Sequence, residues 1–217
     1  MSFRFDFKRA EELQLLLSRR IVERDCFNYP PKIICGVDVS YRKNVAVSAA
    51  VNLDFHSMGV LEEFTVTCSV NFPYIPGFFA FRELRPILLA LKSLSLKPDV
   101  ILVDGHGRAH PRRFGLASHL GLILDASTIG VAKRLLCGDI VLDKPWREDV
   151  FPILLNGEVV GVVIKRFGKS LFVSVGHRVC LDTAVDIVLH CIRSHIIPIP
   201  ILLAHNLCKK RLTSLSV

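Results

Sequence analysis

Three extended, largely apolar segments follow one another between residues 33 and 70, and only short connections separate them. The segments cover residues 33–41, 45–54 and 58–70. Connections this short favour hairpins between neighbouring strands over a long crossover. The sequence therefore predicts an antiparallel meander of three strands, and the rest of the chain must pack around it.

The later segments mix helical and extended patterns. Helices are expected at 78–94, 113–124, 181–194 and 200–211, and strands at 100–104, 126–131, 151–155, 158–166 and 171–175. Asn156-Gly157 is typical of a hairpin turn. Together the segments predict an α/β fold with a mixed sheet, in which residues 1–217 form a single domain.

An amphipathic helix is expected at 6–24, before the first strand. Its leucines and an isoleucine fall on one stripe, at Leu13, Leu16, Leu17 and Ile21. A stripe of this kind normally packs against other apolar surface. We therefore expect this helix to cover the sheet.

The charge of the chain points towards polyanions. Lys and Arg number 28 against 20 Asp and Glu, which gives a formal net charge of +8. A basic globular protein often binds nucleic acid, although charge alone is weak support. The sequence has neither a P-loop nor a G-x-G-x-x-G motif, which argues against a phosphate-binding metabolic enzyme.

Cysteine spacing and hydropathy bear on the compartment. The seven cysteines include no C-x-x-C pair, so neither a disulfide framework nor a zinc ribbon is expected. The N-terminus carries charges where a signal peptide needs an apolar stretch. No apolar run reaches the roughly 18 residues of a membrane-spanning helix. We expect a cytoplasmic monomer without membrane contact.

The segment from Asp104 to Gly115 concentrates reactive side chains. An apolar strand runs into Asp104, and three glycines, two histidines and three arginines follow within eleven residues. A structural loop needs turn residues, but it does not need this density of imidazole and guanidinium groups. His110, Arg112 and Arg113 are candidates for contacts to phosphate oxygens.

Three carboxylates are candidates for a metal site. Asp38 closes the apolar part of the first strand, Asp104 closes the fourth strand, and Glu83 shares a helix face with Phe79 and Ile87. Buried carboxylates are costly unless they are paired or bind metal, and oxygen ligands suit Mg²⁺ or Mn²⁺. Asp38 capping a turn and Glu83 pairing with Arg82 or Arg85 at the surface remain alternatives.

Two basic residues and one aromatic turn extend this site. His205 on the last helix can join the metal ligands, and Lys133 after an apolar strand can stabilise a phosphate. Tyr74 and Ile75 lie between two prolines and form a rigid tip that can enter a base stack. The alternatives are that His205 is a helix residue with ordinary hydrogen bonds, that Lys133 is a surface lysine, and that residues 74–75 form an ordinary turn.

Five motifs, in order along nearly the whole chain, resemble the endonuclease V family. They are Gly36-Val37-Asp38-Val39-Ser40-Tyr41, Pro73-Tyr74-Ile75-Pro76-Gly77 with Phe81-Arg82-Glu83, Asp104-Gly105-His106-Gly107 with His110-Pro111-Arg112, Gly130-Val131-Ala132-Lys133, and Gly176-His177-Arg178. The resemblance implies an RNase H-like fold and a metal-dependent endonuclease directed at inosine. It implies hydrolysis of the second phosphodiester on the 3′ side, leaving a 5′-phosphate and a 3′-hydroxyl.

The resemblance also assigns roles to residues of this chain. Asp38, Glu83, Asp104 and His205 would hold Mg²⁺, with Mn²⁺ as a substitute, and Lys133 would act at the scissile phosphate. Tyr74 and Ile75 would separate the strand, and Arg82, His110 and Arg112 would support substrate or metal. The base pocket would be lined by Gly77, Phe79, Gly105, Gly115, Leu116 and Leu136, whose glycines allow close backbone approach.

Other functions remain open on the residues alone. A junction resolvase or a ribonuclease with an RNase H-like fold would share the carboxylates, and a non-catalytic protein could bind modified bases with the same pocket. The substrate is expected to be DNA containing deoxyinosine or RNA containing inosine, and the sequence does not separate these two.

Overall fold

The computed structural model describes residues 5–215, so residues 1–4 and 216–217 at the ends of the predicted domain lie outside the description. The helices are α1 (Phe7–Ser18), α2 (Ala80–Lys92), α3 (Leu116–Leu124), α4 (Leu181–Cys191) and α5 (Ile199–Ser214). The strands are β1 (Ile33–Arg42), β2 (Val45–Asp54), β3 (Val60–Ser69), β4 (Val100–Asp104), β5 (Ser127–Ala132), β6 (Asp139–Ile140), β7 (Val150–Leu155), β8 (Glu158–Arg166) and β9 (Lys169–His177).

These strands form one mixed sheet in the order β3-β2-β1-β4-β5-β9-β8-β7-β6. The pairs β1–β2 and β2–β3 are antiparallel, which confirms the predicted meander. The pairs β1–β4 and β4–β5 are parallel, whereas β5–β9 is antiparallel. The parallel strands therefore run towards the same edge of the sheet, where residues after their apolar runs come together.

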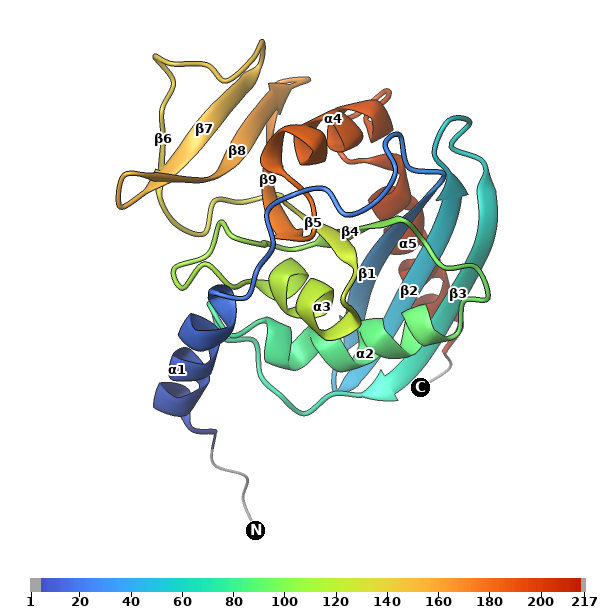
Figure 1. Cartoon of the computed structure of the whole chain (residues 1–217). Helices are drawn as coiled ribbons and strands as arrows, with labels where there is room; N and C mark the ends of the chain where they lie inside the picture. Colours follow the sequence, from blue (N-terminus) through green and yellow to red (C-terminus); the bar gives the residue numbers. More distant parts are fainter. Residues whose placement is uncertain (1–4, 216–217) are drawn as a thin grey trace.

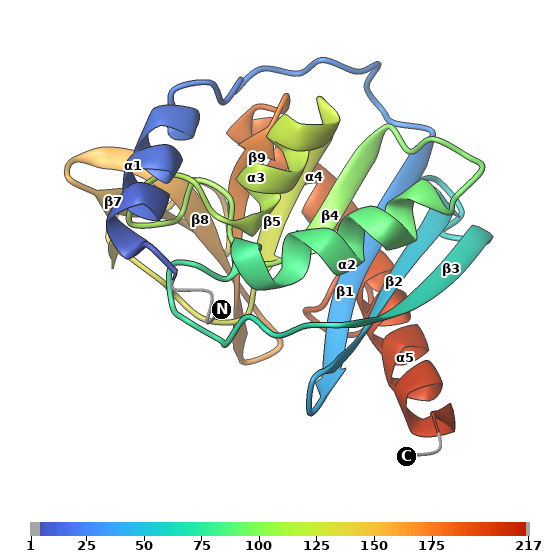
Figure 2. The ribbon, with the colours of Figure 1, turned by 90° about the horizontal axis from the view of Figure 1, so that it is seen from below.

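Helices cover both faces of the sheet, as Figures 1 and 2 show. α2 and α3 pack on one face, where Ile87 and Leu120 join Val37, Ile101 and Val103 in a buried cluster. α4 and α5 pack on the other face, where a larger cluster is built from strands and both helices. The result is a three-layer α/β arrangement, in agreement with the predicted fold class.

The prediction for α1 was wrong in extent and orientation. The helix ends at Ser18, where the hydroxyl bonds the Leu15 carbonyl, instead of continuing to residue 24. Leu13 and Leu16 are 43% and 61% exposed, and the buried residues are Ala10 and Gln14. Figure 2 shows α1 beside the layers of the molecule, away from the face of the sheet. Gln14 donates hydrogen bonds to the Gly77 and Phe114 carbonyls, and Phe7 meets Phe78 edge to face, so the leucine stripe did not indicate which side of the helix packs.

Two simpler features of the described chain complete the fold. All seven cysteines are free thiols. None of the helices within residues 5–215 combines the length and the apolar character that crossing a membrane requires.

β1 and α5 approach each other closely at Gly36. A Cβ atom at residue 36 would lie 2.1 Å from the Pro200 carbonyl carbon and oxygen, which are backbone atoms. Gly36→Ala is therefore expected to force α5 off the sheet and to lower the free energy of unfolding by about 3 kcal/mol. Urea denaturation measures this loss.

Gly59→Ala is the matched control for this prediction. The nearest atom to a Cβ at residue 59 is the Ser57 hydroxyl, at 3.3 Å, and that side chain can turn away. Equal midpoints for Gly36→Ala and the wild type would contradict the close contact between β1 and α5.

Candidate active site

Asp38 and Asp104 lie level with each other on neighbouring parallel strands. Val37 pairs with Val103, so the residue after each of them occupies the same level of the sheet. Asp38 lies inside β1, which continues to Arg42, whereas the sequence pattern placed it near the strand end. Asp104 is the last residue of β4. Parallel pairing thus accounts for the meeting of two carboxylates from distant parts of the chain.

Glu83 reaches the same place from α2. Glu83 is only 4% exposed, which rules out the alternative that it pairs with Arg82 or Arg85 at the surface. Arg82 instead stacks over the Tyr41 ring, with its guanidinium carbon 4.0 Å from the ring centroid, and donates to the Phe72 carbonyl. The Tyr41 hydroxyl donates a 3.0 Å hydrogen bond to Glu83 Oε1. Tyr41 was part of a sequence motif, but its contact with Glu83, 42 residues further along the chain, was not predicted.

Asp38 and Asp104 each face a basic side chain. His205 Nδ1 lies 2.8 Å from Asp38 Oδ2. Lys133 Nζ donates to Asp104 Oδ2 over 2.6 Å. The structure therefore brings all five predicted catalytic residues together, from β1, α2, β4, the bend after β5, and α5.

The pKa of two carboxyl groups reflects this crowding. Burial raises the pKa of Glu83 well above its usual value, and the charges of Asp38 and Asp104 raise it further. Burial also raises the pKa of Asp104, although the ammonium group of Lys133 acts against it. Neighbouring negative charges therefore disfavour ionisation of Glu83 and Asp104, and a bound cation would relieve the repulsion.

The donor set fits a divalent metal by its chemistry. Three carboxylates converge in one cavity, and carboxylate oxygens are the donors that Mg²⁺ prefers. Among residues 5–215, however, no group of three His, Cys, Asp or Glu side chains is already arranged around one point for a metal ion. Oxygens of Asp38 and Asp104 instead contact His205 and Lys133.

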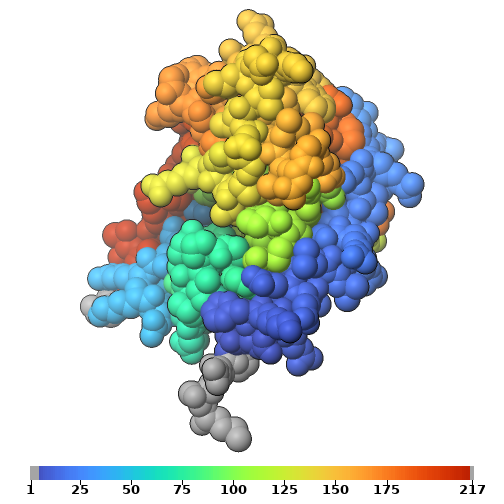
Figure 3. Space-filling model, turned by 90° about the vertical axis from the view of Figure 1, so that its left-hand side faces the viewer, coloured from blue at the N-terminus to red at the C-terminus, as the bar shows by residue number. Residues whose placement is uncertain are grey.

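A cavity of about 580 Å³ opens at these carboxylates. Figure 3 looks onto the side of the molecule where the segments near residues 75–80 (turquoise), 105–115 (green) and 133–137 (yellow-green) meet. The predicted residues that line the cavity are Asp38, Tyr74, Gly77, Phe79, Glu83, Asp104, Gly105, His110, Gly115, Leu116, Lys133, Leu136 and His205. Ile75, Arg82 and Arg112 are not among the lining residues.

Away from the carboxylates, the cavity walls combine glycine backbone with apolar side chains. A Cβ at Gly115 would lie 2.3 Å from the His106 carbonyl oxygen, and a Cβ at Gly105 would lie 3.1 Å from the Leu116 side chain. Tyr74 is 67% exposed and meets Phe79 edge to face, with ring centroids 5.5 Å apart. This part of the cavity is suited to a flat ring that contacts backbone atoms.

Gly77 is held by side chains that the sequence did not connect with it. Its φ of +79° is in the left-handed region. The Gly77 carbonyl lies 3.1 Å from Gln14 Nε2, 3.1 Å from His110 Nε2 and 2.8 Å from Arg112 Nη2. Gln14 is 1% exposed, and its role in holding Gly77 was not predicted from the sequence. The available signal was one polar residue among the leucines of the helix.

His106 links two walls of the cavity. Its Nε2 lies 2.9 Å from the Arg134 carbonyl oxygen, next to the segment that contains Leu135 and Leu136. The contact between His106 and Arg134 was not predicted from the sequence either, because the two residues are 28 positions apart along the chain.

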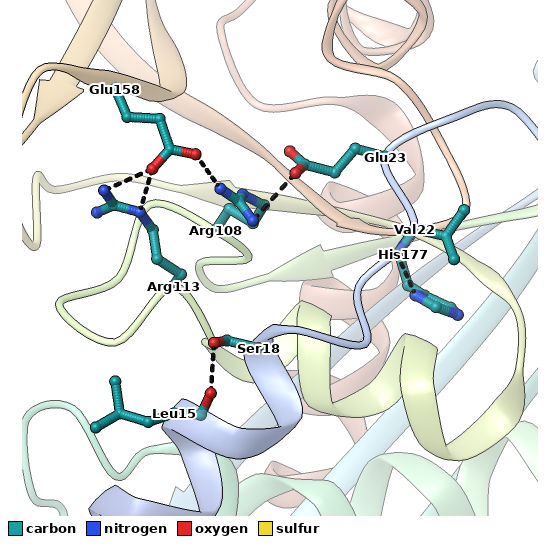
Figure 4. A network of polar contacts seen from close by, with 8 residues as sticks. All are labelled: Leu15, Ser18, Val22, Glu23, Arg108, Arg113, Glu158 and His177. Atoms are coloured by element: carbon teal, nitrogen blue, oxygen red, sulfur yellow. Dashed lines mark hydrogen bonds and ion pairs between the residues drawn. The ribbon is translucent and has the colours of Figure 1, made fainter.

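The arginines of the loop have protein partners. Arg113 and Arg108 both pair with Glu158, over 2.8 and 2.5 Å, and Arg108 also pairs with Glu23 at 3.0 Å. Figure 4 shows Glu158 between the two guanidinium groups, with Glu23 on the far side of Arg108. Arg112 pairs with Glu11 at 3.2 Å and donates to Gln14. The expectation that Arg112 and Arg113 face phosphate does not agree with these contacts.

His110 in the loop and His119 in α3 are both buried and uncharged at neutral pH. Burial and the charge of Arg112 lower the pKa of His110 to about 3, and burial lowers that of His119 to about 4. The unfolded chain binds protons at both residues near pH 6.5, whereas the folded chain does not. Unfolding is therefore favoured progressively as the pH falls from about 6.5 towards 4.

The stability of the protein should show this titration. We expect these two histidines to remove roughly 3 kcal/mol of unfolding free energy between pH 7 and pH 5. The His119→Asn variant should lose roughly 1–2 kcal/mol less over the same interval. Urea denaturation at the two pH values measures both. Identical losses in the two proteins would contradict the burial of a neutral His119.

Comparison with known proteins gives consistent results. The family model described as Endonuclease V matches residues 16–206. The Endonuclease V of Thermofilum pendens is 42% identical over 204 residues, which cover 93% of this chain and 87% of that protein.

Solved structures agree with the fold. The Endonuclease V from Streptomyces avermitilis has a TM-score of 0.88 and 38% identity, and the match covers 98% of this chain and 95% of that one. The Endonuclease V of Ciona intestinalis, solved in complex with a 24mer DNA containing an inosine followed by a ribo-adenosine, has a TM-score of 0.84 and 31% identity. That match covers 97% of this chain and 100% of that one.

Proposed function

The chain belongs to the endonuclease V family, and we propose that it recognises inosine in nucleic acid and hydrolyses a phosphodiester on the 3′ side of it. One observation carries the proposal. A single cavity contains both a compartment walled by glycine backbone and apolar side chains and a group of three carboxylates. The proposal includes a role in DNA repair, in the cytoplasm, by a monomeric enzyme.

The compartment suits a flipped hypoxanthine. Its glycines, Gly77, Gly105 and Gly115, bring backbone groups to the ring, and Phe79, Leu116 and Leu136 provide apolar contact. Tyr74 and Ile75 form the tip that replaces the extruded base in its stack. Gln14, His110 and Arg112 act indirectly, because they fix the Gly77 carbonyl.

The carboxylates suit hydrolysis of the phosphodiester. Nucleases of this family depend on a metal, and we propose Mg²⁺, with Mn²⁺ as a substitute, held by Asp38, Glu83, Asp104 and His205. When bound, such a cation activates water and neutralises charge on phosphate oxygens. The Tyr41 hydroxyl keeps Glu83 oriented towards the site. Lys133 places a positive charge beside Asp104, where it stabilises the phosphate as negative charge develops.

A cleavage assay on matched strands tests the proposal. Four oligonucleotides are compared, DNA and RNA, each with one inosine or with adenine in its place. Cutting is expected for at least one inosine strand with Mg²⁺, with products that carry a 5′-phosphate and a 3′-hydroxyl, and it should stop on chelation of the metal. Equal cutting of the adenine and inosine strands would rule out inosine recognition. The DNA and RNA strands also show which sugar the enzyme prefers.

A further inference from the structure

Exposed cations gather at one end of the molecule, beyond the active site. Arg42 ends β1 and Lys43 begins the turn to β2, whereas Lys209, Lys210 and Arg211 lie in the C-terminal half of α5. The two elements touch, because Arg42 Nη1 donates to the Leu215 carbonyl over 3.4 Å. We call these five residues the C-terminal basic surface. In Figure 3, which views the side of the molecule with the cavity, the end of α5 (red) and the β1–β2 turn (light blue) lie at the left margin.

These cations lack the carboxylate partners that other basic residues have. The sequence contains no Asp or Glu after Asp186, and none between residues 39 and 53. Within residues 5–215, none of the five forms an ion pair. By contrast, Arg108 and Arg147 each pair with two carboxylates, and Arg113 shares the carboxylate of Glu158 with Arg108. A positive surface without internal compensation attracts a polyanion from outside.

The surface is continuous with the catalytic group. α5 runs along β1, and His205 on this helix contacts Asp38. Lys209 follows four residues later and therefore lies on the same helix face, about 6 Å further along the axis. Arg211 is a further 3 Å along, by the same rise per residue. The cations thus begin one helical turn beyond the carboxylates.

The proposed base compartment lies on the other side of the carboxylates. Leu116 begins α3, which packs on the sheet face opposite to α5. A strand whose base occupies the compartment therefore passes the carboxylates and continues towards α5. Because hydrolysis is proposed on the 3′ side of inosine, the continuing part of the strand is its 3′ part.

We propose that the C-terminal basic surface binds the sugar–phosphate backbone of the substrate strand, 3′ to the scissile bond. This inference rests on the proposed function for its direction along the strand. The contacts are to phosphates, so they add affinity without reading sequence, and they weaken as salt rises. Lysine ammonium groups suit this task because they act as mobile point charges.

Binding measurements with strands of different reach test the surface. The variant is Lys43→Gln/Lys209→Gln/Lys210→Gln, which leaves the structural Arg42 in place. Fluorescence anisotropy without added metal keeps the strands intact. Three DNA strands are used. In the first strand about three nucleotides follow the inosine, and in the second about twelve follow it. In the third strand the longer extension precedes the inosine. The variant should bind the 3′-extended strand about tenfold or more weakly than the wild type does. For this strand, the slope of log affinity against log salt concentration should become shallower by about two to three. The variant and the wild type should bind the other two strands equally well.

The control removes the same charge at the opposite edge of the sheet. Lys32, Lys92 and Lys97 are exposed near the start of β1 and the end of α2, and their triple Gln variant should bind every strand as the wild type does. Equal weakening on all three strands, the same loss in the control, or no loss at all would overturn the inference. A fourth strand, with adenine in place of inosine and about three nucleotides after it, tests the proposed function separately. Equal binding of this strand and its inosine counterpart would count against inosine recognition.

Discussion

Asp104→Asn is expected to reduce cutting of an inosine strand by at least about a thousandfold while the protein still binds the strand. Asp104 ends β4 level with Asp38, and its carboxylate is a proposed metal ligand that also contacts Lys133. Asn has nearly the same shape but no charge, so the fold and the base compartment remain. Single-turnover cleavage with Mg²⁺ and strand binding without it measure the two effects separately.

The control for this variant is Asp125→Asn. Asp125 is an exposed residue at the end of α3, where its backbone is left-handed, a conformation that Asn adopts readily. Its substitution should leave cleavage unchanged. If Asp104→Asn cuts at a rate within about tenfold of the wild type, the catalytic role of Asp104 is wrong.

Lys133→Met is expected to lower the cleavage rate at saturating substrate by about a hundredfold, with a smaller effect on binding. The lysine side chain is 49% exposed, and it lies 2.6 Å from Asp104 at the cavity. Met preserves the length of the chain and removes the charge, so a phosphate that gains negative charge in the transition state is less well stabilised. The measurement separates kcat from KM under steady-state conditions.

Lys144→Met provides the comparison for Lys133. Lys144 is exposed in the segment between β6 and β7 and is not among the residues that line the cavity. It should leave kcat and KM unchanged. A Lys133→Met enzyme whose KM rises while kcat stays constant would show that the lysine only contributes ground-state binding.

The elements of the sheet were predictable because their signals are local. β2, β4 and β8 begin and end at the predicted residues, since each is an extended apolar run between turn residues. Asp38 and Asp104 were identified as candidates because each follows an apolar run. The parallel pairing that sets them at the same level of the sheet is seen only in the structure. Glu83 was found by helical periodicity, which places it on the buried face with Ile87.

The contacts that support the site were not predictable, because each joins distant parts of the chain. Gln14 lies 63 residues from Gly77 in sequence, and Tyr41 lies 42 residues from Glu83. The stripe on α1 misled for the same reason, since a single polar residue among its leucines does not show which distant groups Gln14 contacts. The composition of the loop indicated charge, but the partner of Arg113, Glu158, comes from a hairpin 45 residues away.

The central claim is that the base compartment and the carboxylates act on one strand at a fixed spacing. The most direct measurement maps the cut in a set of strands that differ only in the position of a single inosine. With Mg²⁺, the cut is predicted to move by one nucleotide whenever the inosine moves by one, and to remain at the second phosphodiester on its 3′ side. A cut that stays at the same place while the inosine moves would contradict the account.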